Sequence, residues 1–216
     1  MKFDAVVFDM DGVIFDSEKK VVECWQEIAA KHNIEEIEEA CSACLGLNRE
    51  ATKVYFFSKY GEDFPYEEYK TEMSDLFHTR YGNGKIPVKQ GVREILDSLK
   101  GHGKKIALAT STREAIVVDE LKAAGLYDYF DAIVCGNMVE KSKPEPDIFL
   151  MACEKLAVVP KDAFAIEDSY NGVRSASSAG IRTIMVPDLA PATEEMRELA
   201  EVILPSLYEV MEYCGL

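Results

Sequence analysis

Short apolar runs rich in β-branched residues recur along the chain, separated by polar segments. Runs of this kind are typical of strands that are buried on both faces of a parallel sheet. We predict five strands, at Phe3–Phe8, Lys105–Thr110, Ala132–Cys135, Ala163–Ile166 and Thr183–Val186. Helical patterns lie between the later strands, at Arg113–Ala124, Pro146–Leu156 and Tyr170–Ala179. Strands that alternate with helices indicate βαβ units, and therefore an α/β fold with a doubly wound parallel sheet.

The first connection differs from the others because about a hundred residues separate the first strand from the second. A crossover helix needs far fewer. The stretch begins with an apolar stripe at helical spacing, formed by Val21, Val22, Trp25, Ile28 and Ala29. Further helices are predicted at Glu35–Leu45, Arg49–Tyr60 and Tyr66–Tyr81, followed by a loop at Tyr81–Pro87. We therefore expect a helical insertion at 17–86 and an α/β core formed by 1–16 and 87–216.

The C-terminal tail, Glu194–Leu216, shows a mixed pattern. We expect a polar amphipathic helix, then a short strand-like run, Val202–Leu204, and then a final helix. Nothing in the tail indicates a functional role.

The chain of 216 residues carries a formal charge of −15, and 48% of its residues are hydrophobic. Such an acidic protein is a poor candidate for binding nucleic acid, which requires basic patches. Apolar runs long enough to span a membrane are absent, and the N-terminal residues do not resemble a signal peptide. We expect a cytoplasmic protein that acts as a monomer.

Six cysteines are scattered along the sequence, and only Cys41 and Cys44 have the spacing of a metal or redox motif. No second pair or nearby histidine completes a zinc site. Helix packing in a reducing compartment is the simpler interpretation. The sequence leaves any further role of this pair open.

Two acidic pairs follow two of the predicted strands: Asp9 and Asp11 after the first, and Glu167 and Asp168 after the fourth. Ligands of open α/β sheets bind beyond the carboxyl ends of the strands, so these carboxylates are expected to share one cleft. Gly12 permits the turn that brings Asp9 and Asp11 together. Asp, Glu and Gly are common after strands, but two pairs in this position favour a site. Because the carboxylates repel one another, we expect a hard cation such as Mg²⁺ between them.

Hydroxyl groups and a lysine follow the second and third predicted strands. Thr110, Ser111 and Thr112 end the second strand and offer donors for an anion. Lys143 lies beyond the third strand and is expected to begin a helix that has proline near its start. Each also has an ordinary interpretation, as a helix N-cap or a solvated lysine. Together they offer the charge stabilisation that phosphoryl transfer requires.

The order of these motifs resembles the haloacid dehalogenase superfamily, in the branch that contains beta-phosphoglucomutase and related sugar phosphatases. The resemblance covers nearly the whole chain and rests on Asp9-Met10-Asp11-Gly12, Thr110, Lys143-Pro144-Glu145-Pro146-Asp147 and Glu167-Asp168-Ser169. It implies a Rossmann-like core with a mobile helical cap. It also implies a Mg²⁺-dependent phosphatase that acts on a small phosphorylated metabolite such as a sugar phosphate.

The resemblance assigns roles to the four carboxylates. Asp9 would attack phosphorus and form an aspartyl-phosphate. Asp11 would protonate the leaving oxygen and then activate water. Mg²⁺ would be bound by Asp9, Asp168 and the backbone carbonyl of Asp11, with Glu167 orienting its waters.

By the same resemblance, Thr110 and Lys143 would hold the oxygens of the phosphoryl group during transfer. The hydroxyl of Ser111 is a further candidate for binding the substrate. The helical insertion would close over the site, exclude water and contact the leaving group.

Other activities of the superfamily remain to be compared with the phosphatase. Dehalogenases and phosphonatases lack the second aspartate of the first motif, so Asp11 argues against both. Arg49 matches a cap arginine that binds the distal phosphate in beta-phosphoglucomutases, although an exposed helix-start residue is an equal interpretation. The mutases also carry a cap histidine, where this chain has Val21, and a cap lysine, where it has Leu76. These losses favour hydrolysis, and the mutase stays as the alternative.

A second alternative is a protein that binds a phosphorylated ligand without catalysis. Loss of Asp9 or Asp11 would be its mark, and both are present.

Overall fold

A computed structural model describes residues 2–82 and 84–216. Its centre is a parallel sheet in the order β3-β2-β1-β4-β5-β6. The strands are β1 (Ala5–Phe8), β2 (Lys105–Thr110), β3 (Ala132–Cys135), β4 (Ala163–Glu167), β5 (Arg182–Met185) and β6 (Val202–Ile203). The predicted α/β fold with a doubly wound parallel sheet is confirmed, although β1 starts two residues later than predicted and β4 ends one residue later.

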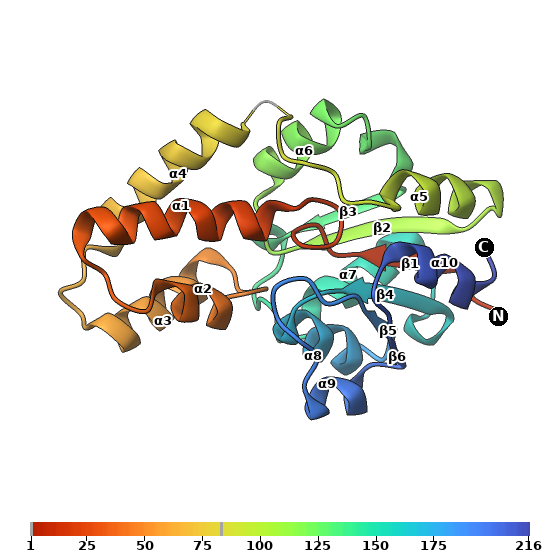
Figure 1. Ribbon diagram of the computed structural model, residues 1–216. Coiled ribbons are helices and arrows are strands. Elements are labelled where there is room, and N and C mark those ends of the chain that lie inside the picture. The colour runs from red at the N-terminus through yellow and green to blue at the C-terminus, as the bar shows by residue number, and fades with distance from the viewer. Residues whose placement is uncertain (1, 83) are drawn as a thin grey trace.

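The two faces of the sheet are packed differently. Val6 and Phe8 of β1 point into one apolar cluster, whereas Ala5 and Val7 point into the other. Helices on the first face are α5 (Val92–Gly101), α6 (Glu114–Ala123) and α10 (Leu207–Cys214). Helices on the second face are α7 (Asp147–Leu156) and α8 (Tyr170–Ser178), with α9 (Glu194–Leu199) beside α8. Helices α7 and α8 cover the second face of the sheet (Figure 1), and the small alanines of that face leave room for them. Helix α5 was not predicted.

Short 3₁₀ turns complete the connections among the described residues, at Tyr127–Tyr129, Gly136–Met138 and Pro160–Asp162. No helix in the described part of the chain is long and apolar enough to cross a membrane.

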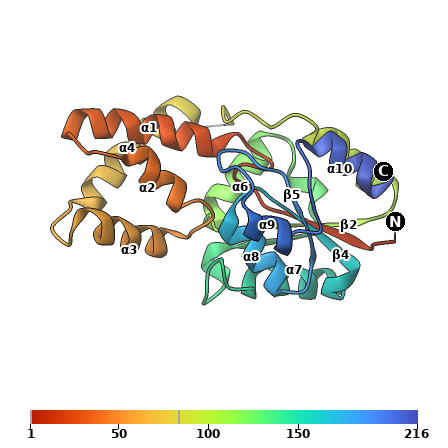
Figure 2. The same cartoon turned by 60° about the horizontal axis from the view of Figure 1, so that its bottom comes forward.

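A separate group of helices lies beyond one end of the sheet (Figures 1 and 2). They are α1 (Ser17–His32), α2 (Ile37–Ala43), α3 (Arg49–Tyr60) and α4 (Tyr66–Tyr81). Their own apolar cluster includes Trp25, Phe56, Tyr66 and Met73, which are at most 3% exposed. The predicted helices are confirmed, with α2 shorter than expected. Part of the predicted loop at Tyr81–Pro87, namely Asn83, lies outside the described residues, and the division into core and insertion stays a prediction.

The register of the strands aligns the predicted motifs. Phe8 pairs with Leu108 of β2 on one side and with Ile166 of β4 on the other. The residues that follow these three therefore lie in a row at the carboxyl edge of the sheet. This edge faces helices α1–α4.

Candidate active site

Lys143 lies at the centre of a buried ion cluster. Its ammonium donates to Asp9 Oδ1 at 2.5 Å, to Glu167 Oε1 at 2.6 Å and to the carbonyl of Ala109 at 3.1 Å. An ammonium has three N–H groups, so all of them are used. Because Lys143 is only 1% exposed, the interpretation as a solvated lysine is excluded.

The prediction that Lys143 begins a helix is wrong. Helix α7 starts at Asp147, and Lys143 lies in the preceding loop. The reason is the pair of prolines, Pro144 and Pro146, because a residue before proline is driven away from helical geometry. A turn in this loop, closed by a hydrogen bond from the Glu145 N–H to the Ser142 carbonyl at 3.0 Å, holds the lysine within reach of Asp9.

Both carboxylate oxygens of Glu167 accept hydrogen bonds from neighbouring groups. Its second oxygen, Oε2, accepts from the backbone N–H groups of Asp168 at 3.0 Å and Ser169 at 3.2 Å, and from Ser169 Oγ at 3.0 Å. A Cβ atom on Gly172 would lie 1.8 Å from Glu167 Oε1, so only glycine allows the first turn of α8 to pass this close. Glu167 therefore fixes the position of Lys143.

Asp168 differs from Glu167 because its carboxylate is buried without a donor. It is 3% exposed, and no hydrogen bond or ion pair of its side chain exists within residues 2–82 and 84–216. A Cβ on Gly12 would lie 2.1 Å from Asp168 Oδ2, so the glycine makes room for this carboxylate. Oxygen atoms of Asp9, Glu167 and Asp168 lie within 4.8 Å of one another.

The charges of this cluster are unbalanced. Burial raises the pKa of Asp9 to about 8, against the opposing effect of the Lys143 ammonium. Burial and the neighbouring Glu167 carboxylate raise the pKa of Asp168 well above its usual range. A divalent cation between Asp9 and Asp168 would remove this conflict, and an all-oxygen set of acceptors suits Mg²⁺. The residues present therefore fit the implied metal.

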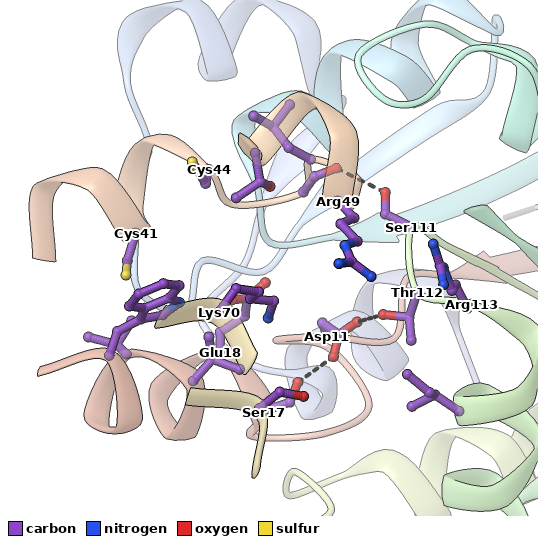
Figure 3. Close-up of a pocket in the computed structure, with 18 of the residues that line it drawn as sticks. Asp11, Ser17, Glu18, Cys41, Cys44, Arg49, Lys70, Ser111, Thr112 and Arg113 are labelled. Carbon is purple, nitrogen blue, oxygen red and sulfur yellow. Dashed lines mark hydrogen bonds between the residues drawn. The ribbon is translucent and has the colours of Figure 1, made fainter. Parts of the chain in front are cut away.

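Asp11 faces away from this cluster and into a cavity. Ser17 Oγ donates to its Oδ1 at 2.6 Å, and Thr112 Oγ1 donates to its Oδ2 at 2.8 Å (Figure 3). Thr110 Oγ1 is more distant, at 3.5 Å. The two close hydroxyls orient the carboxyl group of Asp11 toward the space above Asp9. Binding of a metal by the Asp11 carbonyl stays a prediction.

Thr110 and Ser111 are placed differently from each other. Thr110 is fully buried, and its hydroxyl accepts from the backbone N–H of Thr112 at 3.1 Å. Ser111 lines the cavity, and its Oγ donates to the carbonyl of Gly46 at 3.0 Å. Asn171 makes a parallel contact, from Nδ2 to the carbonyl of Leu45 at 2.9 Å. Two hydrogen bonds thus join the loop between α2 and α3 to the carboxyl edge of the sheet.

A cavity of about 360 Å³ lies between this edge and helices α1–α4. Its polar lining comes from both sides and includes Asp9, Asp11, Asp168, Ser111, Thr112 and Arg113 from the edge, and Ser17, Glu18, Arg49, Thr52, Lys70 and Ser74 from the helices. Arg49 was a predicted site residue, and it also donates from Nη2 to Glu67 at 2.5 Å. Lys53 contacts the same carboxylate at 2.8 Å. Arg49 is therefore a cavity residue that already holds an ion pair.

Two charged residues of the cavity, Glu18 on α1 and Lys70 on α4, were not predicted from the sequence (Figure 3). Burial raises the pKa of Glu18 to about 8 and lowers the pKa of Lys70. Val21, at the place of the mutase histidine, does line the cavity, whereas Leu76 packs against the apolar cluster of the helices. The signal that could have found Lys70 is its position within the buried face of its helix.

Cys41 and Cys44 also line the cavity, as free thiols. Burial raises the pKa of both thiols to about 12. Since the thiolate is the form that binds metals and attacks disulfides, neither group is prepared for that chemistry at neutral pH.

The sheet is parallel, and a lysine lies between buried carboxylates at the ends of β1 and β4. This arrangement is that of an α/β enzyme with a centre suited to a cation and an anion. The sequence profile of the haloacid dehalogenase-like hydrolase family matches residues 6–186. The chain belongs to this family. The predicted family is thus confirmed, as is the predicted enzyme class, a phosphatase.

Known proteins resemble this chain along most of its length. A phosphorylated carbohydrates phosphatase from Thermotoga maritima is 34% identical over 84% of this chain and 83% of the relative. A beta-phosphoglucomutase from Bacillus subtilis is 31% identical over 96% of this chain and 95% of its own. The crystal structure of CbbY from Rhodobacter sphaeroides in complex with phosphate matches with a TM-score of 0.79 and 27% identity, covering 96% of both chains.

Proposed function

We propose that the protein is a Mg²⁺-dependent phosphatase that hydrolyses a small phosphorylated metabolite, most simply a sugar phosphate, through an aspartyl-phosphate. One observation carries this proposal: the oxygens of Asp9, Glu167 and Asp168 lie within 4.8 Å of one another, and Asp9 and Asp168 open into the 360 Å³ cavity. The similarity to phosphatases of phosphorylated compounds supports it.

Asp9 is the nucleophile in this proposal. Its carboxylate attacks phosphorus, the bond to the leaving oxygen breaks, and an aspartyl-phosphate forms. Lys143 holds one oxygen of Asp9 and so leaves the other free to attack. When bound between Asp9 and Asp168, Mg²⁺ neutralises charge on the phosphoryl oxygens.

Asp11 is the acid and base of both steps. It gives a proton to the leaving oxygen and later takes one from the water that hydrolyses the aspartyl-phosphate. Its hydrogen bonds from Ser17 and Thr112 keep it over the cavity, close to Asp9 but outside the carboxylate cluster. Thr110 and Lys143 hold the oxygens of the phosphoryl group during transfer, and the hydroxyl of Ser111 also binds the substrate. Helices α1–α4 act as the cap that encloses the leaving group.

A phosphomutase of the beta-phosphoglucomutase type is the second candidate. Its support is the 31% identity to such an enzyme and the place of Arg49 in the cavity. Against it, Val21 offers no proton-transferring group, and Arg49 is already paired with Glu67. Replacing Arg49 tests the point: a rise in KM confined to bisphosphorylated substrates supports the mutase, and an unchanged KM for all substrates counts against it.

The direct test is phosphate release from a panel of sugar, polyol and nucleotide phosphates, with Mg²⁺ and again with a chelator. We expect release from a few esters, lost on chelation. If no ester is hydrolysed, the next assay is interconversion of beta-glucose 1-phosphate, which would support the mutase. Metal and phosphate binding without any turnover would leave the non-catalytic alternative.

A further inference from the structure

Glu18 lies on a helix face that is otherwise apolar. It precedes Val21, Val22 and Trp25 on α1 at helical spacing, so its side chain shares their face, which points toward the cavity. No hydrogen bond or ion pair of the Glu18 carboxylate exists within the described ranges 2–82 and 84–216. A partly buried carboxylate without a donor destabilises the fold, so another requirement has to explain its presence.

Lys70 repeats this situation on α4. Tyr66 and Met73 are each 1% exposed, and Lys70 lies between them at spacings of four and three residues. Lys70 also makes no hydrogen bond or ion pair with any described residue. Helices α1 and α4 pack side by side, and both charges meet the same cavity (Figure 3). They form no ion pair with each other, and the cavity that both side chains line can admit a ligand group.

We propose that Glu18 and Lys70 determine specificity by binding hydroxyl groups of the leaving group, which makes the substrate a sugar or polyol phosphate. This inference rests on the proposed phosphatase function. A hydroxyl group both donates and accepts, so it can donate to the Glu18 carboxylate and accept from the Lys70 ammonium. Each hydrogen bond involves a charged partner, which is the stronger kind.

The pair does not suit a second anionic group. Its charges sum to zero, and a phosphate or carboxylate near Lys70 would also face the carboxylate of Glu18. Of the two arginines that line the cavity, Arg49 is already neutralised by Glu67, and Arg113 lies on the opposite side, at the edge of the sheet. A neutral group with several hydroxyls satisfies both unpaired side chains at once.

The test compares Lys70→Met and Glu18→Gln with matched controls in helices α1–α4, one in α3 and one in α1. Lys59→Met removes an ammonium that pairs with Glu36 and Glu39, and Glu27→Gln removes a carboxylate that pairs with Arg80. The readout is the kcat/KM for ribose 5-phosphate, glucose 6-phosphate or glucitol 6-phosphate, whichever is best, divided by that for phenyl phosphate. We expect this ratio to fall about 10–100-fold in the two cavity variants and to stay constant in the controls.

Binding is measured separately from turnover. Trp25, the only tryptophan of the sequence, lines the cavity, so its fluorescence reports ligand entry. In an Asp9→Asn background, Lys70→Met should weaken binding of the same sugar phosphate by a similar factor. Lys70→Met should also raise Tm by about 2–4 °C, because an unpaired charge leaves the apolar face. A residue with only a structural role would lower Tm instead.

An unchanged ratio in both variants would overturn the inference, as would binding that depends on Lys70 only for ligands with a second phosphate or carboxylate. The two proposals fail in different ways. If no ester releases phosphate but Trp25 still reports Lys70-dependent binding of a sugar phosphate, hydrolysis fails and the role of the pair stands. If phosphate is released with an unchanged ratio, hydrolysis stands and the role of the pair fails.

Discussion

The two sides of the cavity treat charge in opposite ways. At the carboxyl edge of the sheet, Lys143 is bonded to both Asp9 and Glu167, and all three of its N–H groups are used. On the helices, Glu18 and Lys70 are unpaired with respect to every described residue. The first arrangement is complete before a substrate arrives, apart from the cation. The second is completed only by a ligand.

This difference reflects what each side has to do. Every phosphate ester presents the same phosphoryl group, so the groups that act on it gain from being fixed in advance. The leaving group varies between substrates. Its recognition requires polar groups that have no hydrogen-bond partner within the protein. Groups left unpaired in this way reject any substrate that fails to satisfy them. The paired Lys143, Asp9 and Glu167 thus serve the chemistry, and the unpaired Glu18 and Lys70 serve the selectivity.

We call the sheet edge, where all three N–H groups of Lys143 are bonded, the saturated side of the cavity, and helices α1–α4 its selective side. Replacing the nucleophile is the most severe test of the saturated side. Asp9→Asn keeps the shape of the side chain but removes the attacking oxygen anion, so kcat should fall on the order of 10⁴-fold or more. Steady-state phosphate release measures this. Asp4→Asn, at the other end of the same strand region and exposed, is the matched control and should keep full activity. Activity near that of the wild type in Asp9→Asn would end the covalent mechanism.

Breaking the central ion pair should be costly to the fold itself. Lys143→Met leaves the buried carboxylates of Asp9 and Glu167 without their cation, and such a loss costs about 3–5 kcal/mol of unfolding free energy. Urea denaturation measures it, and added Mg²⁺ should restore part of the stability because it supplies positive charge. Lys155→Met, an exposed control, should change little. A loss below about 1 kcal/mol would show that the two carboxylates are not both charged.

A smaller change tests the room left for the metal ligand. Gly12 has φ +83°, and a Cβ there would collide with Asp168 Oδ2. Gly12→Ala should therefore weaken Mg²⁺ binding about 10–100-fold. Gly103 also has a positive φ, +65°, but nothing lies within 4 Å of its Cβ position. Gly103→Ala thus carries the backbone strain alone, and calorimetric titration should give it unchanged Mg²⁺ affinity. Equal losses in both variants would contradict the role of the collision.

The saturated side was largely predictable from the sequence. Residues that follow neighbouring parallel strands meet at one edge, so Asp9, Thr110 and Glu167 could be brought together without coordinates. The sequence pattern did not predict that Lys143 contacts Asp9 from a loop. The two prolines after Lys143 move the start of the helix away from it. The pattern also did not provide the hydroxyl of Ser17, since its contact with Asp11 depends on the turn between β1 and α1.

On the selective side, the helices were predictable from the sequence, but the site residues that they carry were not. An apolar stripe predicts which face of a helix is buried, but it does not say whether that face meets another helix or a cavity. Lys70 was therefore not among the predicted site residues, although its spacing from Tyr66 and Met73 places it on the buried face. Attention to a charge within such a stripe would have found both Lys70 and Glu18.

The weakest expected effect concerns the contact between the two sides. Ser111 and Asn171 each donate one hydrogen bond to the loop between α2 and α3. Loss of either bond costs about 0.5–1.5 kcal/mol, so KM should rise about 2–10-fold in Ser111→Ala and in Asn171→Ala. Ser58→Ala, which removes a hydroxyl bonded only within α3, is the control for both.

The pair of variants also separates two roles of Ser111. Asn171 reaches the loop through the carbonyl of Leu45 and does not line the cavity. If both variants raise KM equally, the hydroxyl of Ser111 acts by holding the loop against the sheet edge. If only Ser111→Ala does so, its hydroxyl leaves Gly46 and binds the substrate, as the sequence predicts. In that case a hydrogen bond of the saturated side is exchanged for one to the substrate. The two sides of the cavity then differ less than their hydrogen bonds suggest.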